Sequence, residues 1–104
     1  MGLPPQIGYS SPAQALAALR ARPDVAFSEQ RGWTVAEDLA NRAIWSFVPP
    51  EDPAYPAVVR RRVVQRGTAV FVDAQLLCGA TKPVCDALLR EFQQLNEAAR
   101  RDFH

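Results

Sequence analysis

The segment that decides the fold is AVVRRRVVQRGTAVFVDAQLLC, residues 57–78, in which two runs rich in valine lie on either side of Gly67. Runs of β-branched and apolar residues separated by a glycine turn predict a β-hairpin. We therefore expect one long hairpin that turns at Gly67, within a sheet whose neighbouring strands are antiparallel.

Three shorter strands are predicted upstream of this hairpin. Apolar residues at 25–27 and at 33–35 alternate with polar or small residues, which is the pattern of half-buried strands, and Gly32 suits the turn between them. The run RAIWSFV, residues 42–48, predicts a third strand that stops at Pro49. The chain therefore contributes five strands in sequence order.

A helix is predicted at each end of the chain. Ser11 is a good N-cap and Pro12 suits the first helical position, so the first helix should span residues 12–21. The second follows Thr81, and its apolar residues recur at helical spacing: Val84, Leu88, Phe92, Leu95 and Ala99. The fold class is therefore α+β: an antiparallel five-stranded meander sheet flanked by an N-terminal and a longer C-terminal helix, with both helices on one face.

Composition bounds the possible functions. The chain has 104 residues, 48% of them hydrophobic, with 12 basic and 11 acidic residues. We expect a disordered tail over residues 1–10 and a single domain over residues 11–104. No apolar run approaches the ~20 residues of a membrane span, and the balanced charge disfavours nucleic acid as a partner.

Cys78 and Cys85 are the only cysteines of the chain. A structural zinc ion needs four nitrogen or sulfur ligands, and His104 is the only histidine, so we expect no metal and no cofactor. A strand end and the first turn of the next helix can lie within the ~5.5–6 Å that a disulfide requires. A disulfide is favoured over two buried thiols, and it favours export, most simply to a bacterial periplasm, over a cytoplasmic location. The first residues, MGLPPQIGYSSP, lack an apolar signal segment, so either the protein is made without a leader or the native leader precedes Gly2. The cysteine pair favours the second alternative.

The segment WSFVPPEDPAYPAVVRRR, residues 45–62, is the predicted binding region. Its four prolines stiffen a loop, and a rigid loop loses little entropy on binding. The candidate binding residues are Trp45, Phe47, Asp52, Tyr55, Arg60 and Arg62. The alternative is that the aromatic residues only pack over the sheet. We expect Trp45 to be buried, with the 49–56 loop as the exposed contact surface. Arg61 points away from Arg60 and Arg62 on a strand, so the arginines do not form one patch.

The same segment, together with LLCGATKPVCDALLREFQQLN at residues 76–96, resembles small exported bacterial proteins of unknown function. Those proteins share a Trp-x-Phe…Pro-Ala-Tyr-Pro-Ala segment and a late cysteine pair. The resemblance implies export and a disulfide. Their pattern has a histidine where Asp52 stands here, so no catalytic residue is carried over.

No enzyme is predicted. Catalytic carboxylates are usually buried with a raised pKa, whereas the pairs Glu37-Asp38 and Glu51-Asp52 fall in expected turns. The leading hypothesis is a non-catalytic exported domain that binds a protein or peptide through its sheet and proline-rich loop. The alternatives are a structural or envelope-stress component without a ligand, and a cytosolic accessory protein with weak nucleic-acid contacts.

Overall fold

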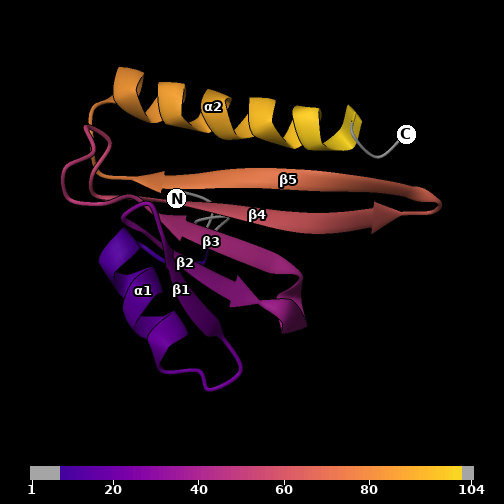
Figure 1. The fold of residues 1–104 in the computed structure, drawn as a ribbon, viewed down its shortest axis with the longest axis horizontal. Coiled ribbons are helices and arrows are strands. Elements are labelled where there is room, and N and C mark those ends of the chain that lie inside the picture. The colour runs from indigo at the N-terminus through magenta and orange to yellow at the C-terminus, as the bar shows by residue number, and fades with distance from the viewer. Residues whose placement is uncertain (1–7, 102–104) are drawn as a thin grey trace, which may run out of the picture.

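The predicted five-stranded meander sheet is confirmed. The computed structural model describes residues 8–101, with side chains as far as Leu95. All neighbouring strands are antiparallel, and their spatial order follows the chain (Figure 1). The strands are β1 (Ala26–Gln30), β2 (Trp33–Asp38), β3 (Ala43–Phe47), β4 (Ala57–Arg66) and β5 (Ala69–Cys78), with a short 3-10 helix, η1 (Leu39–Asn41), before β3.

The two predicted helices are present with the expected first turns. Helix α1 spans Pro12–Arg20, one residue shorter than expected, and the Ser11 hydroxyl accepts a hydrogen bond from the Gln14 N–H at 3.1 Å. Helix α2 spans Lys82–Arg101, and its first backbone bond runs from the Cys85 N–H to the Thr81 carbonyl at 3.0 Å. Both caps satisfy backbone groups that a helix end leaves without partners.

The helices lie on opposite faces of the sheet, so the prediction that both cover one face is wrong (Figure 1). Helix α1 packs Ala15 and Leu19 against a cluster that includes Trp45 and Val58. Helix α2 packs against the other face, where its buried side chains meet those of β4 and of the loop between β3 and β4: Leu88 and Phe92 with Val48, Ala54, Ala57 and Val59. The physical reason is that β3 and β4 carry apolar side chains at both odd and even positions, which point to opposite faces of the sheet. Each face must therefore be covered to exclude water.

Part of the expected N-terminal tail contacts the domain. Residues 1–7 lie outside the described residues, but Tyr9 packs edge-on against Trp45, with ring centroids 5.7 Å apart. Ser10 donates its backbone N–H to the Gln14 side chain at 3.0 Å. Residues 9 and 10 therefore extend the cover of the α1 face.

The predicted disulfide between Cys78 and Cys85 is present, with 6.0 Å between the two Cα atoms. It joins the last residue of β5 to the first turn of α2 and leaves no free cysteine. The bridge therefore fastens α2 to the strand that precedes it. None of the helices in the described range is long and apolar enough to cross a membrane.

We expect reduction of the Cys78–Cys85 bridge to lower the free energy of unfolding by about 2–3 kcal/mol, because the short closed loop restricts the unfolded chain. The measurement is urea unfolding with and without reductant. A double variant, Cys78→Ser with Cys85→Ser, serves as control and should show no effect of reductant. Two reactive thiols in the denatured, unreduced protein would contradict the bridge.

Candidate functional site

Trp45 and Phe47 belong to the core rather than to an exposed surface. Both lie on the α1 face of β3, and the predicted burial of Trp45 is confirmed, since its exposed fraction is 4%. Phe47 is buried beside it. Neither ring can therefore form a broad aromatic contact patch on the sheet.

The three consecutive arginines of β4 divide between the two faces. Arg60 pairs with Trp45 and Arg62 with Ala43, so these two arginines share the α1 face. Arg61 pairs with Ile44 on the α2 face, where its guanidinium lies 5.3 Å from the centre of the Phe92 ring. The prediction that the triplet does not form one patch is confirmed.

A cavity of about 300 Å³ opens on the α1 face and brings together three of the predicted binding residues. We call it the arginine cavity. Its lining residues come from η1, β2, β3, β4, α1 and the segments that flank α1: Gly8, Tyr9, Leu19, Arg22, Asp38, Asn41, Ala43, Trp45, Arg60 and Arg62. Three guanidinium groups and one carboxylate thus face a shared space.

Arg60 and Arg62 contact side chains of the neighbouring strands β3 and β5. The Arg60 guanidinium lies 5.6 Å from the centre of the Trp45 ring and donates a hydrogen bond to the Gln75 side chain. Arg62 approaches Asp73 at 3.9 Å. Burial lowers the pKa of Arg60, and the neighbouring charge of Arg62 lowers it further, while Asp73 opposes the shift. The lining of the cavity has an excess of positive charge, because it holds three arginines and one aspartate.

The third arginine, Arg22, is held by Asp38, a carboxylate that was expected in a turn. Its Nη1 and Nη2 atoms donate to the two carboxylate oxygens of Asp38 at 2.7 and 2.9 Å. Asn41 donates to the same carboxylate at 2.8 Å. The hydrogen bonds from Arg22 lower the pKa of Asp38, although burial opposes that shift.

The expectation that Glu37-Asp38 lies in a turn is wrong, because Asp38 is the last residue of β2 and is buried. The sequence contains a signal that Asp38 is buried. Asp38 shares strand parity with Ala36, which faces the core, so a carboxylate at that position requires a partner. What the sequence does not reveal is that the partner is Arg22.

Asp52 and Tyr55 lie in the loop between β3 and β4, apart from the arginine cavity. The Asp52 carboxylate accepts the Ala54 N–H at 2.8 Å and so stabilises a turn. Tyr55 is 50% exposed and lines a smaller cavity of about 240 Å³, together with Phe47 and several prolines. The structure thus divides the six predicted binding residues among two cavities and one turn.

A third hollow, of about 580 Å³, lies on the α2 face. Its aromatic side chains include Trp33 and Phe92, whose ring centroids are 5.8 Å apart. Arginines and glutamates line it in equal number, Arg31 and Arg61 with Glu37 and Glu91. This hollow therefore lacks the charge excess of the arginine cavity.

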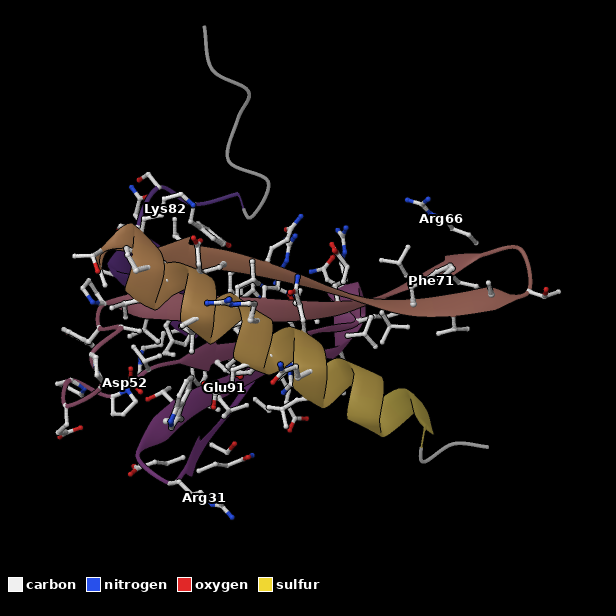
Figure 2. All side chains as sticks on the ribbon, turned by 90° about the horizontal axis from the view of Figure 1, so that it is seen from above. Arg31, Asp52, Arg66, Phe71, Lys82 and Glu91 are labelled. Atoms are coloured by element: carbon white, nitrogen blue, oxygen red, sulfur yellow. A yellow bond between two sulfur atoms is a disulfide. The ribbon has the colours of Figure 1, made fainter. Side chains whose placement is uncertain are left out.

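An exposed feature at the tip of the β4–β5 hairpin was not predicted from the sequence. Strand β3 pairs with β4 only from Val58 to Arg62, so residues 63–72 project beyond β3, and we call them the hairpin arm. Figure 2 shows Arg66 and Phe71 on a part of the hairpin that α2 leaves uncovered. The exposed fractions of its apolar side chains are 42% for Val63, 55% for Val70, 42% for Phe71 and 38% for Val72.

The backbone of β5 has an open outer edge. The Val48 N–H donates to the Ala57 carbonyl at 3.1 Å and the Val63 N–H to the Arg42 carbonyl at 3.0 Å, so odd-numbered residues of β4 bond toward β3. Even-numbered residues of β4 therefore bond to odd-numbered residues of β5. It follows that the N–H and C=O groups of Val70, Val72, Ala74 and Leu76 point away from the sheet.

Comparisons of the chain with protein-family models, with curated proteins and with solved structures found no match. Within the described part of the chain, no group of three or more His, Cys, Asp or Glu residues is placed to hold a metal ion. The arginine cavity, the hairpin arm and the outer edge of β5 are therefore the candidate functional features of this domain.

We expect Asp38→Ala to lower the free energy of unfolding at neutral pH by about 1.5–3 kcal/mol, because it removes charged hydrogen bonds in a buried place. The pKa of Asp38 lies below its ordinary value of 3.8 in the folded protein. Its stabilising contribution is therefore present above that value and is lost as the pH falls through the folded pKa. Chemical unfolding at neutral pH and at about pH 2 should show the difference between variant and wild type shrinking in acid.

Asp24→Ala is the matched control, since Asp24 binds the same guanidinium at 2.7 Å but is exposed to solvent. Its effect should be smaller than that of Asp38→Ala, because exposed ion pairs contribute little. Equal effects of the two variants, or an Asp38→Ala effect that does not change with pH, would contradict this account.

Proposed function

We propose that this protein is a non-catalytic, exported interaction domain that binds an extended segment of a protein or peptide as an added strand along β5. The hairpin arm carries the proposal, because it combines an open backbone edge with apolar side chains that stay exposed. Strand addition takes its affinity from backbone hydrogen bonds and its specificity from alternate side chains.

The outer edge of β5 has little of the usual protection of an edge strand, since Asp73 is the one charged residue of the strand. Proteins commonly protect such edges with lysine, proline or a β-bulge. Residues 69–78 contain neither lysine nor proline. The register with β4 runs unbroken from Ala69 to Cys78, so no bulge twists the edge away. An edge of this length with so little protection favours a partner strand.

The side chains of the hairpin arm also favour the addition of a strand to β5. Val70 and Val72 point to the α2 face and Phe71 to the other face, so an added strand would meet apolar side chains on both sides. Burying this surface would be favourable by roughly 25 cal/mol for each Å² removed from water. We therefore expect the partner segment to carry apolar side chains at consecutive positions, because successive residues of a strand face opposite sides of the sheet.

Two further observations support the non-catalytic and exported parts of the proposal. A general acid near neutral pH needs a raised pKa, whereas the pKa of the buried Asp38 is lowered by Arg22. The Cys78–Cys85 disulfide is of the kind that persists in oxidising compartments. Export would place the open edge of β5 among other exported proteins.

A photo-crosslinking amino acid at Val70 should form covalent adducts with a different protein in cells that produce this one naturally. The same amino acid at Ala13, an exposed position of α1, is the control and should form none. Adducts are detected by gel shift and identified by mass spectrometry.

A second change tests strand addition itself. Val72→Pro removes an N–H that points outward, so it should abolish the Val70 adduct, whereas Val72→Thr keeps the N–H and should retain it. Thermal unfolding would verify that both variants fold. Adducts of equal yield from Val70 and Ala13 would refute the proposal, and adducts between two copies of this chain would replace the foreign partner with self-association.

A further inference from the structure

The arginine cavity contains buried hydrogen-bond donors without acceptors. The Trp45 Nε1 and Arg62 Nε atoms are buried, and neither has a hydrogen-bond partner within the described part of the chain. A buried donor without a partner loses its hydrogen bond to water and gains none in return, so buried indole N–H groups usually have an acceptor. Both donors belong to residues that line the cavity.

The charges around the cavity point to the kind of acceptor that would fit. Each side-chain nitrogen of Arg22 already donates to Asp38 or Asp24, so this arginine and Asp38 largely neutralise each other. Arg62 has its carboxylate partner at 3.9 Å, beyond hydrogen-bond distance. Arg60 and Arg62 are two residues apart on one strand face, so their like charges repel. An anion between them would relieve that repulsion.

The walls of the cavity limit the size of the ligand. A volume of about 300 Å³ is at the lower end of the range of small-molecule sites. The rings of Tyr9 and Trp45 and the apolar side chains of Leu19 and Ala43 complete the lining. A small anion with an apolar body would fit such walls better than a fully hydrated ion.

We propose that the arginine cavity binds a small oxyanion, a carboxylate or a phosphate group, through Arg60, Arg62 and the indole N–H of Trp45. Guanidinium groups bind planar carboxylates and phosphates through paired, charge-assisted hydrogen bonds. No residue of β5 lines the cavity, so this site is separate from the outer edge of β5, and either proposal can fail without the other.

The test is a fluorescence titration of Trp45 in a Trp33→Phe background, which removes the only other tryptophan. The probes are sodium phenylacetate and sodium phosphate, with sodium chloride added to hold the ionic strength constant. We expect a saturable change with a dissociation constant of about 1 mM or lower. Saturation with phenylacetate alone assigns the site to carboxylates, and saturation with phosphate alone assigns it to phosphates.

Arg62→Gln should weaken binding at least about tenfold, because it removes a charge-assisted donor. Arg66→Gln is the matched control: it makes the same change on the same strand, in the hairpin arm and outside the cavity, and should leave the dissociation constant unchanged. Equal losses in both variants would show a general charge effect and overturn the site. If Arg62→Gln does not fold, calorimetric titration of the wild-type protein decides, because the absence of saturable heat with both probes also overturns it.

Discussion

The pairing of β3 with β4 is the constraint on which the rest of the structure depends. Trp45 faces Arg60 and Phe47 faces Val58, so one register decides which side chains meet α1 and which meet α2. A slip of one residue in β4 would put Arg61 on the face of Trp45 and move Arg60 to the opposite face. The core and the arginine cavity therefore arise from the same register, and a change that disturbs one should disturb the other.

The difference in length between these two strands produces the hairpin arm. Strand β3 has five residues and β4 has ten. Arg42, just before β3, adopts a left-handed conformation with φ of 53°, and its carbonyl accepts the N–H of Val63. The chain turns away at that point, so β4 beyond Val63 has only β5 as a neighbour. The hairpin arm thus begins where the turn after η1 ends the pairing of β4 with β3.

Features that depend on local pattern could be predicted from the sequence, whereas features that depend on long-range packing could not. The period-two strands, the Ser11 cap and the Cys78–Cys85 bridge are local, because each involves residues close together in the chain. The placement of the helices on opposite faces follows from the burial of both Val58 and Val59, which period-two alternation does not anticipate. The ion pair of Arg22 and Asp38 spans sixteen residues and requires the α1–β1 connection to lie beside the end of β2.

The positions of the disulfide and the arm explain how a strand at the edge of the sheet can remain ordered. The bridge holds the last residue of β5, and Gly67 closes the hairpin at the other end with φ of 61°. Strand β5 is therefore fixed at both ends, with β4 paired along its whole length. Because the edge is already ordered, a partner strand would lose mainly its own conformational entropy on binding, and not that of this domain. The same bridge keeps the start of α2 beside the end of β5. Helix α2 therefore covers the half of the hairpin next to the disulfide, while the hairpin arm stays exposed (Figure 2).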